Sequence, residues 1–213
     1  ILLLRAAGLR DARPAALAWR SFRELVAEDQ EPLAERRLLP LVCRNLSRLG
    51  HPKDPFLGRM YAEAFGATAR MLEEAAPALE ALREAGIRTM VLKGVALVVV
   101  HYRDLGARPM SDVDILVPSA QIDEALDVLE GAGWRSDRTH AWLKTEMHAA
   151  AVTSPSGLTV DLHRHATYEA RFASADEAFF SDAVSLEVAG VVTSAMSAGD
   201  QLLHSVIHGL RWS

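Results

Sequence analysis

The stretch MVLKGVALVVVHYRDLGARPMSDVDILV, residues 90–117, decides the fold that the sequence predicts. It holds Lys93 and Gly94 between two apolar runs, and then Asp112 and Asp114 at the start of a third. Residues two apart in a strand point to the same face, so the two aspartates project side by side. Like charges this close repel each other. A divalent cation relieves that repulsion, and Mg²⁺ in particular binds through one or two carboxylates together with substrate phosphates.

Hydrophobic periodicity extends this core in both directions. Short β-branched runs predict strands, apolar residues at every third or fourth position predict helices, and glycine or proline marks their ends. Around the opening stretch, the pattern predicts strands at 87–92 and 112–117, helices at 95–102 and 120–130, and a candidate edge strand at 134–138. An amphipathic helix is predicted over 198–212, whereas the segment 165–198 is mixed and gives no clear pattern.

A β-hairpin is predicted between these elements. The turn residues Ser-Pro-Ser-Gly at 154–157 separate the runs 148–153 and 158–163, which is typical of two antiparallel strands. Alternation along the second run places Asp161 and His163 on its polar face. Asp161 is therefore a third carboxylate, on a later strand than the aspartate pair.

The N-terminal region is predicted to be helical. Residues 1–50 carry leucines and other apolar residues at helical spacing, and Pro14, Pro32 and Pro40 divide them into short helices because proline is tolerated only in a first turn. Residues 51–55, HPKDP, form a linker.

A longer helix follows the linker over residues 56–85. Pro77 is expected to kink this helix or to start a new one, and Gly86 is a suitable residue to end it. The whole pattern predicts an α/β (α+β) fold with a small mixed sheet. We expect a helical region over 1–85 and a sheet-containing domain over 86–213.

Composition restricts the class of protein. The chain has 213 residues, a formal net charge of −5 and one cysteine, Cys43. The negative charge argues against broad binding to nucleic acid, and a single cysteine excludes an internal disulfide and favours a cytoplasmic location. The apolar start is broken by Arg5 and Arg10, so neither a membrane span nor a signal peptide is expected there. A chain that lacks an initial Met and ends inside a predicted helix is expected to be truncated, with the domain incomplete at its C-terminus.

Three groups of residues resemble a known superfamily. They are Lys93-Gly94-Val95-Ala96-Leu97, Arg108-Pro109-Met110-Ser111-Asp112-Val113-Asp114-Ile115-Leu116-Val117, and Val160-Asp161-Leu162-His163. Their order resembles the nucleotidyltransferase superfamily that includes DNA polymerase β. More narrowly, the groups look like a bacterial family of uncharacterised nucleotidyltransferases. The first two are also similar to the AbiEii-type toxin nucleotidyltransferases. The resemblance runs from about residue 86 to the end and includes Asp200-Gln201-Leu202-Leu203-His204.

This resemblance implies a metal-dependent enzyme that moves a nucleoside monophosphate from an NTP, such as ATP, to an acceptor hydroxyl or phosphate. The acceptor stays open among a small molecule, a peptide, a protein and tRNA. The resemblance implies Mg²⁺ (or Mn²⁺) as the cofactor. It implies that the catalytic metal ligands are Asp112, Asp114 and Asp161. It also implies that the nucleotide is bound by Lys93, Gly94, Arg108 and Ser111, and that His163 is a candidate substrate contact.

The chain departs from the superfamily at the glycine turn. Val95 stands where a second glycine or a serine is usual, which removes a hydroxyl ligand for the phosphates. Lys93 can supply a point charge in its place. Two other interpretations stay open: a catalytically inactive module that binds an NTP or another ligand, and an interaction protein, such as an antitoxin or an accessory to peptide-tailoring enzymes.

Two histidines lie on the last predicted helix. His204 and His208 are four residues apart, a spacing that can bind zinc, but the glutamate of a zinc protease motif is missing. We therefore expect them to pack in the fold. Trp134 and Trp142 suit either a core or a base-stacking surface, and Cys43 is expected to fill a helical core.

Overall fold

The computed structural model describes residues 1–26, 36–136, 148–172 and 174–211, and the chain forms two compact units. One unit comprises Ile1–Ala69 and Tyr102–Met110, and the other comprises Arg70–His101 and Ser111–Ser213. The predicted domains 1–85 and 86–213 stay a prediction. Within the described residues, no helix is long and apolar enough to cross a membrane.

The first unit consists of helices, as predicted. Its helices are α1 (Leu2–Gly8), α2 (Ala12–Leu25), α4 (Leu39–Arg48) and the first half of α5 (Pro55–Glu84). Buried Trp19, Phe22 and Leu39 belong to their common core, against which the half-buried Cys43 packs. Pro14 and Pro40 lie in the first turns of α2 and α4, whereas Pro32 and Trp142 lie outside the described residues.

Helix α5 begins and ends with clear local signals. The Asp54 carboxylate accepts hydrogen bonds from the backbone N–H groups of Phe56 and Leu57, which is the usual role of an N-cap aspartate. The helix continues through Pro77, so Pro77 does not start a new helix. The alternative expectation, a kink at Pro77, stays a prediction. At the far end Gly86 has φ +75°, and the N–H of the next residue, Ile87, donates to the carbonyl of Leu82. This is the predicted glycine C-terminus.

The second unit is built on one mixed sheet of seven strands, which confirms the predicted fold class. The strands lie in the order β3-β4-β5-β2-β1-β7-β6. Strand β2 pairs in parallel with β5 and antiparallel with β1, and β1 pairs in parallel with β7. The bounds are β1 Met90–Val91, β2 Val113–Leu116, β3 Arg135–Ser136, β4 Ala149–Thr153, β5 Thr159–His163, β6 Val184–Val188 and β7 Val191–Ala195.

Most predicted elements of this unit are present, with shifted ends. The β4–β5 hairpin is present in the expected register, with Thr153 opposite Thr159, and β3 is an edge strand. The first strand is shorter than the predicted 87–92. The predicted helices correspond to α6 (Lys93–Ala96) with the π-helix η2 (Leu97–His101), η3 (Ser119–Gln121) with α7 (Ile122–Gly131), and α10 (Ala198–Arg211). The unclear segment holds helix α9 (Glu177–Ser181) and the antiparallel pair β6–β7.

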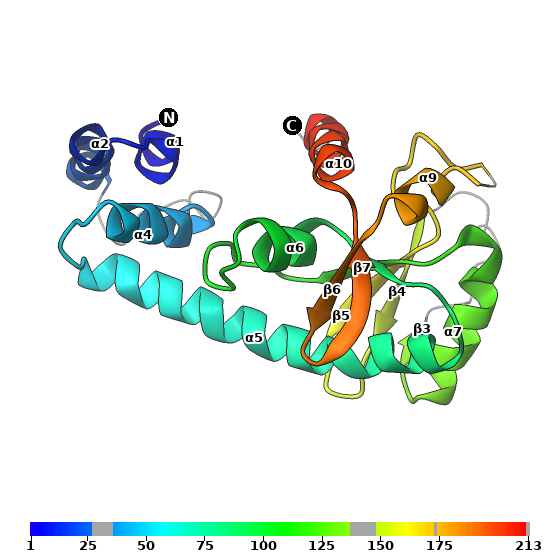
Figure 1. Ribbon diagram of the computed structural model, residues 1–213. Coiled ribbons are helices and arrows are strands. Elements are labelled where there is room, and N and C mark those ends of the chain that lie inside the picture. Colours follow the sequence, from blue (N-terminus) through cyan, green and yellow to red (C-terminus); the bar gives the residue numbers. More distant parts are fainter. Residues whose placement is uncertain (27–35, 137–147, 173, 212–213) are drawn as a thin grey trace. The chain divides into compact units, whose positions relative to one another are not determined.

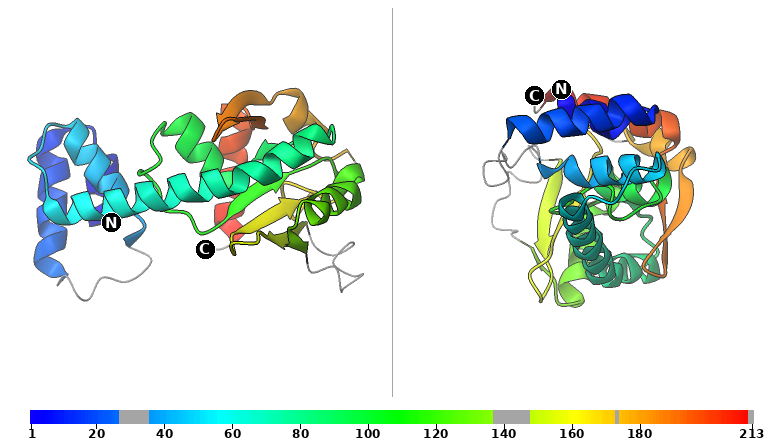
Figure 2. Two further views of the ribbon diagram at one scale, coloured as in Figure 1. Left: turned by 90° about the horizontal axis from the view of Figure 1, so that it is seen from below. Right: turned by 90° about the vertical axis from the view of Figure 1, so that its left-hand side faces the viewer.

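Helices cover both faces of this sheet. In Figures 1 and 2 the half of α5 that belongs to this unit lies over one face, and α10 lies on the opposite face. Alternation along β2 directs Val113 and Ile115 to one face and Asp114 and Leu116 to the other. All four residues are buried. The same rule directs Asp161 of β5 to the face of Asp114, because the two residues are partners in the parallel pairing.

Candidate active site on strands β2 and β5

Two carboxylates lie side by side on neighbouring central strands, on the same face of the sheet. Asp114 of β2 and Asp161 of β5 occupy the same register position, and side chains at such positions are neighbours. One ligand atom from each of Asp114, Asp161 and His163 can be chosen so that the three atoms lie within 4.8 Å of one another. The hairpin that sequence analysis predicted therefore brings its carboxylate beside the aspartate pair.

Asp114 is held by two donors. Its Oδ1 atom lies 2.5 Å from Nζ of Lys93 and accepts a hydrogen bond of 2.8 Å from Nε2 of His163. Burial by itself raises the pKa of a carboxyl group. The hydrogen bond and the charge interaction with His163, together with the charge of Lys93, outweigh burial and lower the pKa of Asp114 to about 2. Asp114 is therefore a carboxylate at every physiological pH.

Asp161 has the opposite electrostatic environment. Burial is the main cause that raises its pKa, and the charge of Asp114 raises it further. Asp112 adds to this repulsion, while His163 and Lys93 partly offset it. Asp161 is thus a half-buried carboxylate next to other negative charges, the arrangement for which a bound cation or a proton is the natural remedy.

Lys93 reaches Asp114 from an unusual backbone conformation. Its φ is +44°, in the left-handed region, and it follows the extended residue Leu92 at the junction of β1 and α6. Sequence analysis placed the turn's special residue at Gly94, but the positive φ falls on Lys93. For a residue with a side chain this conformation is strained, and such strain is concentrated at functional sites.

The remaining predicted site residues are not part of the cluster formed by Asp114, Asp161 and His163. Asp112 is half-buried just before β2, and Ser111 is exposed, with Oγ 3.4 Å from Oδ1 of Asp112. Arg108 belongs to the other unit, in the segment Tyr102–Met110. The nucleotide-binding roles of Lys93, Gly94, Arg108 and Ser111, and the role of Asp112 as a metal ligand, stay predictions.

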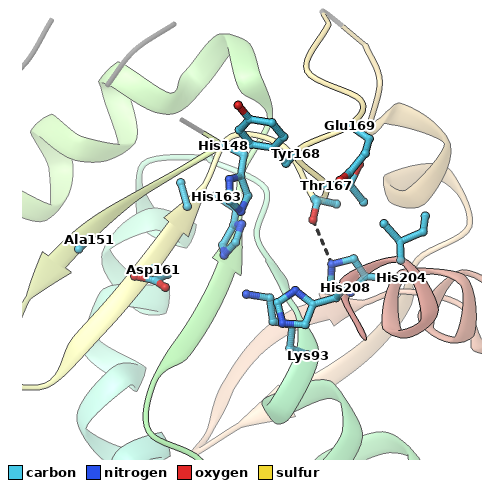
Figure 3. A pocket seen from close by; sticks show the side chains of 13 residues that line it. Lys93, His148, Ala151, Asp161, His163, Thr167, Tyr168, Glu169, His204 and His208 are labelled. Atoms are coloured by element: carbon cyan, nitrogen blue, oxygen red, sulfur yellow. Dashed lines mark hydrogen bonds between the residues drawn. The ribbon is translucent and has the colours of Figure 1, made fainter. Parts of the chain in front are cut away.

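A cavity of about 240 Å³ opens beside Asp161. In Figure 3, Asp161 and His163 lie on one side of it, and Lys93, His204 and His208 lie on the other. His163 is 1% exposed and contacts Asp114, so it positions a carboxylate as well as lining the cavity. Its role as a substrate contact stays a prediction.

Sequence analysis missed several groups of the cavity wall. His148, Tyr168 and Glu169 also line the cavity. Tyr168 and Glu169 lie in the segment 165–198, which has no clear pattern, and His148 begins a predicted strand without a motif that marks it as a site residue. Nε2 of His204 is 3.0 Å from the carbonyl oxygen of Ala166, and burial lowers the pKa of this histidine. His204 therefore packs, as expected, whereas His208 is exposed, contrary to that expectation. Both side chains also line the cavity.

The loop that contains His165 and Ala166, and that carries part of the cavity wall, is held in place by Asp176. The carboxylate of Asp176 accepts hydrogen bonds from Nδ1 of His165 and from the backbone N–H of Ala166, each at 2.9 Å. Both His165 and Asp176 are buried. The carbonyl of the same residue, Ala166, is the partner of His204, so these contacts connect the loop to α10.

Comparison with known proteins assigns the chain to a family. The sequence model of the family described as "Uncharacterised nucleotidyltransferase" matches residues 31–212, most of the chain. The chain belongs to this family. The match confirms the narrower of the resemblances on which the sequence analysis relied, and it does not confirm the similarity to AbiEii-type toxins. No curated protein matches the chain.

The donors at the site of this nucleotidyltransferase fit a divalent cation. Carboxylate oxygens are the ligands that Mg²⁺ and Mn²⁺ prefer, and Asp114 and Asp161 present them from facing positions. The contacts of Asp114 with Lys93 and His163 both use Oδ1, so neither occupies Oδ2. Burial is the main cause that raises the pKa of Asp161, and the charge of Asp114 raises it further; a bound cation would offset both effects.

Proposed function

We propose that this protein transfers a nucleoside monophosphate from an NTP to an acceptor hydroxyl or phosphate, with Mg²⁺ or Mn²⁺ bound by Asp112, Asp114 and Asp161. The observation that carries the proposal is the register pairing of Asp114 with Asp161 in a chain of a nucleotidyltransferase family. When bound, two metal ions stabilise the attacking and leaving oxygens of an in-line displacement.

The protein's own groups have distinct roles in this reaction. The acceptor oxygen forms a bond to the α-phosphorus, and the bond from that phosphorus to the bridging oxygen breaks, so that pyrophosphate leaves. Asp161 has one of two roles: it holds the metal ion on the side of the attacking oxygen, or it takes the proton of an acceptor hydroxyl as a general base. Lys93 neutralises charge on the leaving pyrophosphate.

The cavity supports a place for the acceptor. It opens onto Asp161 of β5 and onto β4, and neither Asp112 nor Asp114 lines it. An acceptor hydroxyl in this cavity would lie next to Asp161, while the nucleotide would bind on the side of Asp112 and Ser111. Small molecules, peptide or protein side chains and the 3′ end of tRNA are the acceptor classes to be compared.

The test is a transfer assay with NTPs labelled at the α- or the γ-phosphate, in the presence of Mg²⁺ or Mn²⁺ and candidate acceptors. Nucleotidyl transfer moves the α-label to the acceptor and releases pyrophosphate. The double variant Asp112→Ala/Asp114→Ala is expected to be inactive, whereas Asp182→Asn, at an exposed position of the same unit, serves as the matched control. Normal activity of the double variant would exclude the assignment, and NTP binding without turnover would favour a binding module.

A further inference from the structure

Lys93 combines two features that a surface lysine does not have. Its backbone is in the left-handed conformation, which favours glycine, so a side chain at this position is retained against a conformational penalty. Its side chain is only 20% exposed and ends on Oδ1 of Asp114. The strain therefore places an ammonium group directly on a carboxylate of the acidic site.

The hydrogen-bond donors are distributed unevenly between the two neighbouring carboxylates. Asp114 has both Lys93 and His163 as partners, whereas Asp161 has no hydrogen-bond donor among the described residues. A cation that approaches the pair meets an oxygen of Asp114 that is already paired with an ammonium group. Two cations at one carboxylate repel each other, so the metal and Lys93 compete for Asp114.

We propose that Lys93 is a built-in counter-ion of the acidic site, which holds Asp114 in the free protein and is displaced when a divalent cation binds together with the triphosphate. This inference rests on the proposed function for the identity of the triphosphate. The lysine stem is flexible, and its ammonium group lies at Asp114, so after release it can turn to a phosphate bound beside this carboxylate. Metal alone binds weakly, and metal and NTP bind cooperatively because each favours the displaced lysine.

The experiment measures the binding of Mn²⁺ alone to the protein, by calorimetry or by the electron paramagnetic resonance signal of free Mn²⁺. Lys93→Met keeps an apolar stem and removes the charge, and it is expected to bind Mn²⁺ roughly 5- to 150-fold more tightly than the wild type, the usual range of coupling between two sites. Lys93→Arg keeps the charge and is expected to bind Mn²⁺ as weakly as the wild type. A non-hydrolysable NTP analogue should tighten Mn²⁺ binding more in the wild type than in Lys93→Met.

Two further variants keep the result interpretable. Lys93→Gly suits the left-handed backbone and should fold well. It also lacks the ammonium group, so it too should bind Mn²⁺ more tightly. Adding Asp114→Asn to Lys93→Met should abolish the gain, which assigns the gain to this site. If Lys93→Met and Lys93→Gly both fold and bind Mn²⁺ no more tightly than the wild type, the counter-ion role is wrong.

The transfer assay separates this inference from the proposed function. Tighter Mn²⁺ binding by Lys93→Met, in a protein that transfers no nucleotide to any acceptor, would contradict the proposed function and leave the counter-ion in place. Conversely, the wild type could transfer nucleotides while Lys93→Met binds Mn²⁺ no more tightly than the wild type does. That result would support the proposed function and contradict the counter-ion role of Lys93.

Discussion

Asp104 in the first unit and Asp161 in the second are carboxylates with opposite surroundings. Asp104 accepts hydrogen bonds from the hydroxyl of Tyr61 at 2.7 Å and from the N–H of Gly106 at 3.0 Å. It also pairs with Nε of Arg44 at 2.9 Å. Each donor comes from a different part of that unit, so Asp104 connects the segment Tyr102–Met110 to α4 and α5.

Asp161 is arranged for something other than stability. Among the described residues it has no hydrogen-bond donor. Burial raises its pKa, and the negative neighbours Asp114 and Asp112 raise it further. Asp104, which connects parts of its unit, thus has several donors, whereas Asp161, which we propose as a ligand, has repulsion in their place; Asp114, the other proposed ligand in this pair, lies between these cases with two donors. The predictions below challenge this distinction, beginning with the largest expected effect.

Asp161→Asn should separate activity from stability. Loss of one group that acts on charge in the transition state typically lowers kcat by roughly a hundred- to a thousandfold, and the transfer assay should show a decrease of this size. The same substitution removes repulsion from Asp114, so the free energy of unfolding without metal should be unchanged or rise by about 1 kcal/mol. Clear destabilisation in urea unfolding, with activity retained, would show that Asp161 serves the fold.

Asp104→Asn should have the reverse effect. It leaves the charge of Arg44 without its partner and weakens the bonds from Tyr61 and Gly106, so the free energy of unfolding should fall by about 2 kcal/mol, the scale of a hydrogen bond to a charged group. Urea unfolding measures this loss, and Asp11→Asn at an exposed position of the same unit is the matched control. A folded Asp104→Asn variant that transfers nucleotide as poorly as Asp161→Asn would break the comparison.

Gly106→Ala tests how tightly the same cluster is packed. A Cβ at this position would lie 2.6 Å from ring atoms of Tyr61, and the ring cannot turn freely because its hydroxyl is bonded to Asp104. Overpacking of this kind costs about 1–2 kcal/mol. Gly8→Ala, where nothing lies within 4 Å of an added Cβ, is the control in thermal unfolding. Equal stability of the two variants would show that the cluster around Asp104 yields easily.

The sequence predicted the elements that carry the acidic residues, because local patterns determine them. Alternation along 158–163 placed Asp161 and His163 on one face, and the Ser-Pro-Ser-Gly turn defined the hairpin. The pair β6–β7 was missed because its turn is Ala189-Gly190. Ala189 has φ +46°, although alanine is not a residue that typically adopts this conformation in a turn. Strand β6 is largely exposed, but its sequence VSLEV alternates apolar and polar residues, a strand signal that could have located it.

The contacts within the site could not be predicted in the same way. Lys93 and Asp114 are 21 residues apart, and His163 and Asp114 are 49 apart. Which of the aspartates receives these donors depends on the register between β2 and β5, and no local pattern encodes that register. The positive φ of the turn was expected at Gly94 because glycine adopts this conformation most easily, whereas the structure has it one position earlier, at Lys93.

Tyr61→Phe should give the smallest effect, and its pH dependence identifies the contact. Burial and the hydrogen bond to Asp104 raise the pKa of Tyr61 from 10.0 to about 12. A raised pKa means that the folded state holds this proton more tightly, so the contribution of Tyr61 to stability is complete below pH 10 and is lost as the pH rises towards 12.

Removing the hydroxyl should therefore lower the free energy of unfolding by about 1 kcal/mol near neutral pH. The difference between the wild type and Tyr61→Phe should narrow when urea unfolding is followed from about pH 8 to about pH 11, because only the wild type has this proton to lose. The narrowing should become smaller when both proteins also carry Asp104→Asn, because the part of the pKa shift that is due to Asp104 is removed while the part due to burial stays, and the double-mutant cycle isolates the part due to the pair. If the difference in the free energy of unfolding stayed constant across this pH range, the hydrogen bond from Tyr61 to Asp104 would not contribute to stability. Asp104 would then have fewer stabilising donors than its geometry suggests.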